Sequence, residues 1–208
     1  MSKAPFEKCV FIICPFDEDY QGILQAILFC VLYLGYQPRI STERQNSSEV
    51  RLQKILDLIE GSKYSIHDLS RCQAANADEF YRLNMPFELG IDYGCRQYLR
   101  GKKEKKILIL EEQKYRYQQA ISDLAGCDIE AHEGDFQKAV PKVRNWLVSE
   151  AGIVAAGSKR ILGAYADFQE WYYKKQLSAG FSDEDIQDYP TAELVAAIQD
   201  WIAAGKPI

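Results

Sequence analysis

The sequence has few of the residues on which metal centres, disulfide frameworks and membrane anchors depend. It contains two histidines and six cysteines in 208 residues, and the cysteines form no C-x-x-C pair. A zinc site would need clustered Cys and His, and scattered cysteines within apolar segments indicate reduced thiols and a cytosolic compartment. No stretch reaches the roughly 18 apolar residues of a membrane span, and no signal-peptide core is present. We therefore expect a cytoplasmic protein without metal or membrane attachment.

Positive charge and phosphate-binding glycines are also scarce. The 25 Lys and Arg residues are outnumbered by 30 Asp and Glu residues, and a net charge of −5 disfavours direct nucleic-acid binding. The longest basic cluster, K-K-E-K-K at 102–106, is interpreted as a solvated turn. No dinucleotide fingerprint, Walker loop or G-x-S-x-G elbow is found. These absences argue against a Rossmann dehydrogenase, a P-loop NTPase and a serine hydrolase.

Residues 1–150 alternate between continuous apolar runs and helical periodicity. Strands are expected at 9–14, 36–41, 64–67, 106–110 and 127–131, and helices at 19–34, 48–60, 86–99, 115–124 and 135–149. Residues 70–83 are polar and irregular. Five β-α repeats predict an α/β domain with a five-stranded parallel sheet and helices on both faces.

Residues 151–208 are predicted to form a helical C-terminal appendage. Ile161, Tyr165, Phe168 and Tyr172 share one helical face, and Ser182 begins a capping-box pattern. A second apolar face follows Pro190. Two interpretations stay open: the helices pack on the flank of the sheet domain, or their aromatic side chains mediate homo-oligomers or contact a partner.

Ligands of open parallel sheets bind beyond the carboxyl ends of the strands, so the residues after each strand are the candidates for a site. Substrate contacts are predicted for Pro15, Phe16, Asp17, Ser41, Ser70, Arg71 and Arg82. Arg39 and Arg51 could also meet a phosphate, although a surface salt bridge is the commoner role. His67 is expected to pack within the sheet end, and His132 is expected at the surface.

Glu88 is the predicted catalytic carboxylate. It falls in the first turn of an expected helix, where the helix N-terminus should lower its pKa and keep it ionised for attack on an oxocarbenium-like centre. Its alternative role is to complement the helix dipole. Asp68 could orient a ribose hydroxyl or share a proton with Glu88, or it could cap a loop. Asn84 could hold Glu88 or a sugar hydroxyl, and could also be the helix N-cap.

Five segments together resemble a known pattern: I-I-C-P-F at 12–16, I-H-D-L-S at 66–70, N-M-P-F-E-L-G at 84–90, Tyr93-Gly94, and I-L-I at 107–109. The pattern is similar to that of the nucleoside 2-deoxyribosyltransferase-like proteins and the bacterial TIR-like proteins, and it covers residues 8–147. The resemblance implies a flavodoxin-like sheet and cleavage or transfer at an N-glycosidic bond of a nucleoside or NAD, with no cofactor beyond that substrate. It assigns Glu88 as nucleophile, Asp68 and Asn84 as ribose-side residues, and Phe16 as a pocket wall. Some bacterial TIR-like members destroy NAD, or make a cyclic signal from it, in antiviral defence.

The sequence also departs from these families. Arg82 stands where the transferases often have an aspartate, and Met85-Pro86 replaces the Trp-Cys pair usual in TIR enzymes. Arg82 could meet a phosphate, which favours a second hypothesis: a module that senses a nucleotide or cyclic nucleotide and signals through oligomerisation of the C-terminal helices. A third hypothesis is a scaffold without a small-molecule site. The row of polar residues at the strand ends argues against it.

Overall fold

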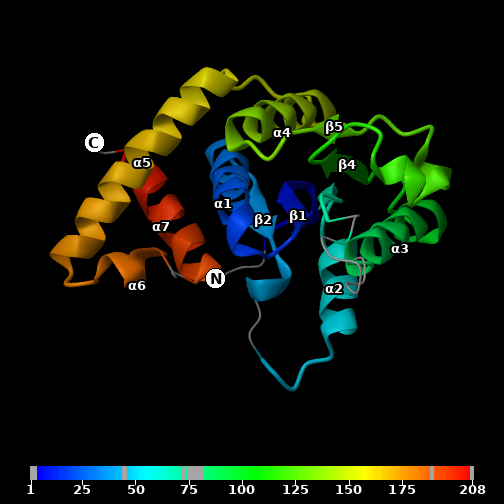
Figure 1. The fold of residues 1–208 in the computed structure, drawn as a ribbon, viewed down its shortest axis with the longest axis horizontal. Helices are drawn as coiled ribbons and strands as arrows, with labels where there is room; N and C mark the ends of the chain where they lie inside the picture. The colour runs from blue at the N-terminus through cyan, green and yellow to red at the C-terminus, as the bar shows by residue number, and fades with distance from the viewer. Residues whose placement is uncertain (1–3, 44–45, 72–73, 75–81, 188–189, 207–208) are drawn as a thin grey trace.

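The computed structural model describes residues 4–43, 46–71, 74, 82–187 and 190–206, and shows in them a five-stranded parallel sheet between helices (Figure 1). The strands are β1 (Cys9–Ile13), β2 (Gln37–Arg39), β3 (Tyr64–Asp68), β4 (Lys106–Glu111) and β5 (Glu130–Ala131), in the order β2-β1-β3-β4-β5. The helices are α1 (Glu18–Tyr33), α2 (Arg51–Glu60), α3 (Asn84–Tyr98), α4 (Phe136–Ala151), α5 (Ser158–Ser178), α6 (Asp183–Gln187) and α7 (Thr191–Ala203). The predicted flavodoxin-like α/β class with C-terminal helices is confirmed.

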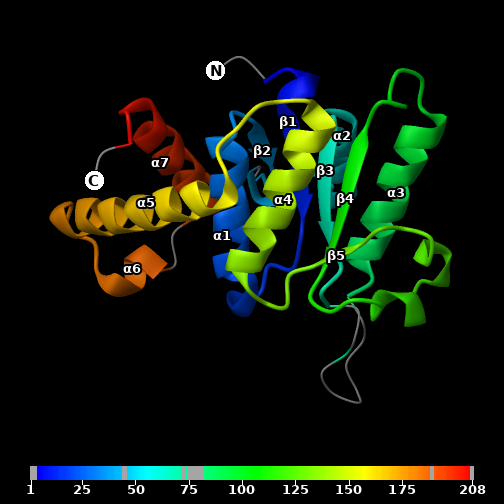
Figure 2. The same ribbon diagram turned by 90° about the horizontal axis from the view of Figure 1, so that it is seen from above.

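Two apolar layers sandwich the sheet. α1 and α4 cover one face, and α2 and α3 cover the other (Figure 2). All five residues of β1 are buried, as a central strand of a parallel sheet requires. Pro38 lies in β2, which is an edge strand and therefore tolerates a residue without an N–H donor. The register of the central pair places Ile13 beside His67, so both strands end at the same edge of the sheet.

Two sequence expectations need correction, and a third segment cannot be compared. Residues 115–124 do not form one helix but two short 3-10 helices, Tyr117–Gln119 and Ser122–Leu124, because the buried Tyr117 ring anchors the segment locally. The last strand is confined to Glu130–Ala131. Most of the irregular segment 70–83 lies outside the described residues.

The basic cluster at 102–106 is not wholly solvated, because Lys105 is buried. Its ammonium donates to the carbonyl of Ile59 at 2.6 Å near the end of α2, and pairs with Asp92 at 3.1 Å. The other oxygen of Asp92 lies 3.0 Å from Nε2 of His67, which is fully buried as expected. A lysine beside the last carbonyls of a helix stabilises that end.

The C-terminal helices pack on the flank of the sheet domain. α1 is buried on nearly all of its faces, because α5 and α7 cover the side turned away from the sheet. The Phe29 ring lies 5.2 Å from that of Tyr165 and 5.7 Å from that of Trp201. The capping box is confirmed: the Ser182 hydroxyl accepts from the Asp185 N–H at 3.2 Å, and the Asp185 carboxylate accepts from the Ser182 N–H at 2.9 Å. Self-association through these helices stays a prediction.

Within the described residues, we find no helix with both the length and the apolar character needed to cross a bilayer.

Candidate functional site

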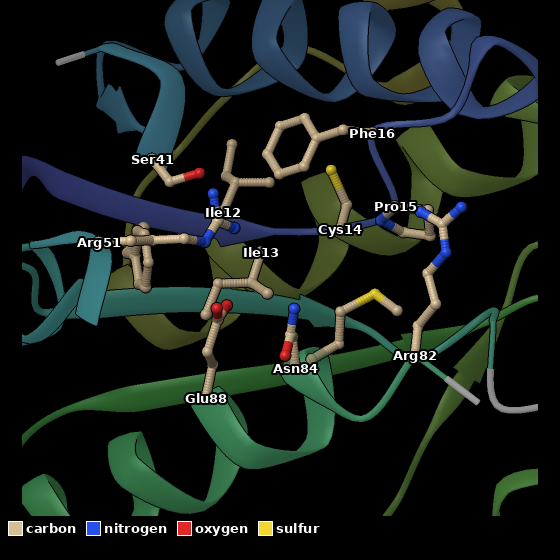
Figure 3. Close-up of a pocket in the computed structure, with 12 residues that line it drawn as sticks. Ile12, Ile13, Cys14, Pro15, Phe16, Ser41, Arg51, Arg82, Asn84 and Glu88 are labelled. Carbon is tan, nitrogen blue, oxygen red and sulfur yellow. The ribbon is translucent and has the colours of Figure 1, made fainter. Parts of the chain in front are cut away.

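A cavity of about 110 Å³ opens at the carboxyl end of β1, beside the point where the strand order reverses between β1 and β3 (Figure 3). Ligands of open α/β sheets bind at such switch points. The cavity is smaller than the roughly 300–1,000 Å³ of pockets that enclose whole drug-sized ligands. It is lined by Phe11, Ile12, Ile13, Cys14, Pro15, Phe16, Ser41, Arg51, Arg82, Asn84, Met85 and Glu88.

Glu88 and Asn84 enter the cavity together from α3 (Figure 3). They are four residues apart, which places both side chains on one face of the helix. Asn84 is the first helical residue and Leu83 is the N-cap, so the expectation that Asn84 caps the helix is wrong. The Asn84 amide is therefore available to the cavity rather than committed to the helix end.

The Glu88 carboxylate is buried and has no hydrogen-bond or ion-pair partner among the described residues. Its residue is 6% exposed, and no hydrogen bond or ion pair reaches it from the described part of the chain. Burial raises the pKa of Glu88, and the nearby charge of Arg51 lowers it only partly. The expectation that the helix N-terminus would lower this pKa is wrong in sign, because desolvation exceeds the favourable electrostatic contributions.

Cys14 is the other residue in the described cavity lining whose ionised side chain would be a strong nucleophile. Burial raises the pKa of its thiol well above the usual value, and the carboxylates of Asp68, Asp17 and Glu88 raise it further. A protonated thiol is a poor nucleophile at neutral pH. Among the lining residues that the structure describes, the Glu88 carboxylate is therefore the best candidate for attack on a substrate.

Asp68 is not among the described residues that line the cavity, although β3 ends beside it. Its carboxylate is fully buried and accepts from the Tyr20 hydroxyl at 2.6 Å, from the Ser70 N–H at 2.9 Å and from the Ser70 hydroxyl. His132 Nε2 lies 2.9 Å from the same carboxylate. Burial alone would raise the pKa of Asp68, but the hydrogen bonds from His132, Ser70 and Tyr20 lower it. The carboxylate thus already accepts hydrogen bonds from three neighbouring residues, which hold the strand end in place.

The hydrogen bond at Nδ1 determines the tautomer of His132. The backbone N–H of Gly134 donates to Nδ1 at 3.1 Å, so Nδ1 carries no proton and Nε2 is the donor toward Asp68. His132 is 1% exposed, and the expectation of a surface position is wrong. Sequence reasoning missed Tyr20 and His132 as partners of Asp68. His132 directly follows β5, so inspection of strand ends could have found it.

An ion cluster borders the cavity on the side of α1. Asp17 pairs with Arg71 at 2.9 Å and with Arg82 at 2.6 Å. Although burial tends to raise the pKa of Asp17, the hydrogen bonds and charges of these two arginines lower it. Of the predicted substrate contacts, the structure places Pro15, Phe16, Ser41 and Arg82 in the described lining. It places Asp17, Ser70 and Arg71 outside that lining.

Comparison with known proteins yields no family model, curated protein or solved structure that matches this chain. In the described residues, no group of three or more His, Cys, Asp or Glu side chains could hold a metal ion.

Proposed function

We propose that the protein cleaves or transfers at an N-glycosidic bond, acting at the ribose anomeric carbon of NAD or a related nucleotide. The observation that carries this proposal is the buried carboxylate of Glu88, which no described residue pairs, beside the Asn84 amide, both facing a cavity at the switch point of the sheet. A carboxylate in this setting can stabilise or attack an oxocarbenium-like centre.

The proposed reaction has two steps. An oxygen of Glu88 forms a bond to C1′ while the C1′–N bond breaks, and its electron pair leaves with the base. Water, or the hydroxyl of an acceptor, then attacks C1′ and releases the carboxylate, losing its own proton to solvent. Asn84 holds a sugar hydroxyl, and Phe16, a residue that is 42% exposed, forms one wall. Asp68 acts only by positioning the end of β3.

A panel of nucleosides, nucleotides and NAD, incubated with the protein and separated by chromatography, tests the proposal. We expect release of free base from at least one N-ribosyl compound by the parent and by Glu193→Gln, a control that removes one exposed carboxylate from α7. Glu88→Gln should release none. Base release from no member of the panel, or equal release by Glu88→Gln, would contradict the proposal.

The pH dependence of the reaction should report the raised pKa of Glu88. The nucleophile must be ionised, so kcat/KM for the fastest substrate of the panel should fall as pH decreases through this pKa, above the range of an ordinary glutamate. Arg51→Gln removes a positive charge that lowers the pKa, and should move this acid limb to higher pH. An acid limb at the position of free glutamate, or one that Arg51→Gln leaves in place, would contradict the assignment.

One observation favours the alternative of a non-catalytic nucleotide sensor. α1 begins two residues after Phe16 and packs directly against α5 and α7, so it joins the cavity to the C-terminal helices. A ligand that shifts the start of α1 could thereby change the surface of these helices. Calorimetry separates the two functions, because tight binding of an intact nucleotide without turnover would support sensing.

A further inference from the structure

Ser41 presents a buried hydroxyl that nothing in the described chain satisfies. It follows β2, begins the 3-10 helix Ser41–Glu43, and is 9% exposed. Its oxygen has no hydrogen-bond partner within the described residues. The residue lines the cavity, and Figure 3 shows the hydroxyl on the side from which Arg51 enters. A buried hydroxyl without a partner is costly, so this one is suited to an external ligand.

Arg51 occupies an electrostatically unfavourable position next to this hydroxyl. It is the first residue of α2, where the helix dipole is positive, and the first turn of α2 contains no acidic residue. The N-cap residue, Val50, makes no side-chain capping hydrogen bond. Arg51 makes no ion pair or hydrogen bond within the part of the chain that the structure describes. Its guanidinium points into the cavity, opposite the Glu88 carboxylate (Figure 3).

We propose that Ser41, Arg51 and the N-terminus of α2 form a subsite for the phosphate of a ribose 5′-phosphate. This inference rests on the proposed function, which places the reacting sugar against Glu88 and Asn84. The hydroxyl of Ser41 and the guanidinium of Arg51 supply hydrogen-bond donors for phosphate oxygens. The positive end of the α2 helix dipole also favours an anion here. The substrate is therefore a nucleotide, and its free nucleoside is a weak ligand.

Arg82 does not provide this phosphate contact. It lies toward the other end of the cavity in Figure 3, and its charge is already paired with Asp17 at 2.6 Å. Arg51 has no such carboxylate partner among the described residues, apart from the electrostatic influence of Glu88 within the cavity itself. Binding of phosphate would thus pair the exposed charge of Arg51 and satisfy the Ser41 hydroxyl, neither of which has a partner among the described residues.

Calorimetry with nicotinamide mononucleotide and nicotinamide riboside tests this subsite, because the two probes differ only in the 5′-phosphate. Glu88→Gln is the parent for these titrations, since it removes turnover and the carboxylate that repels phosphate. We expect the mononucleotide to bind about 10- to 100-fold more tightly than the riboside, as charge-assisted hydrogen bonds to phosphate imply. Excess inorganic phosphate should weaken binding of the mononucleotide and leave the riboside unaffected.

In the Glu88→Gln background, Arg51→Gln should remove most of the difference in affinity between the mononucleotide and the riboside. Ser41→Ala should reduce that difference. Arg96→Gln makes the same charge change at an exposed position of α3 outside the described lining, and should preserve the difference. Equal affinity for the two probes, or a difference that persists in Arg51→Gln, would overturn the subsite. If the wild-type protein still released nicotinamide from the riboside, the proposed function would survive that result. If it released base from neither probe nor any panel compound, the proposed function would fail independently.

Discussion

Replacement of Glu88 by glutamine is expected to abolish turnover and to stabilise the folded protein. Loss of the proposed nucleophile should reduce kcat by at least about 10³-fold, within the range known for removal of a catalytic nucleophile. The stability gain has a separate cause, because the carboxylate is buried with a raised pKa and no partner among the described residues. A neutral amide of the same shape avoids the cost of burying a charge. We expect a gain of about 1 kcal/mol at neutral pH, or roughly 2–4 °C in Tm.

The pH dependence of this gain follows from the sign of the pKa shift. Because the folded-state pKa of Glu88 is raised, the carboxylate costs stability above that pKa and costs none below the unfolded-state pKa, where it is protonated in both states. The difference in Tm between Glu88→Gln and the parent should therefore reach its maximum at neutral pH and disappear at acid pH. Calorimetric melting across this range measures it. Glu193→Gln removes an exposed carboxylate from the first turn of α7, so it should leave turnover unchanged and should not raise Tm. A Glu88→Gln protein that is less stable at neutral pH would refute the electrostatic account.

Replacement of Asp68 by alanine is expected to have the largest effect on stability. It would leave the Tyr20 hydroxyl, the Nε2–H of His132 and the Ser70 hydroxyl without their acceptor in a site that solvent does not reach. Removal of one member of a buried charged network typically costs about 3–5 kcal/mol. Urea unfolding should show this loss. Asp135→Ala is the matched control: it removes the partly buried N-cap of α4 and should cost only about 1 kcal/mol.

Asp68 should also set part of the acid sensitivity of the fold. Its folded-state pKa is lowered, so its contribution to stability is present above the unfolded-state pKa and is lost as pH falls toward the folded-state value. The parent should therefore lose stability in this acid range more steeply than Asp68→Asn, which cannot titrate. If both proteins lost stability equally steeply as pH falls, Asp68 would not be the source of the acid sensitivity.

Local sequence patterns predicted the parts of the fold that depend on nearby residues. The five-residue apolar run of β1 and the helical spacing of α1 are properties of short segments, and both elements were confirmed within a residue or two. The helix predicted at 86–99 left Asn84 outside it; the observed helix begins at Asn84, and this earlier start brings Asn84 and Glu88 to one face and into one cavity. The apolar character of α1 on nearly all of its faces was a further available signal. It indicates a helix covered on both sides, which α5 and α7 provide.

The sequence by itself determined the layers and the edge of the sheet at which polar residues gather, because strand and helix periods are local and a parallel sheet collects its strand ends at one edge. Only the tertiary structure decided which of those residues face the cavity. Asp68 and His132 are 64 positions apart, and their contact depends on how β3 and β5 are held in the sheet. Desolvation of Glu88 depends on the packing of neighbouring elements, so the direction of its pKa shift could not be read from its place in the helix. The burial of a side chain depends on contacts with segments that are distant in the sequence, and local sequence patterns carry no information about those contacts.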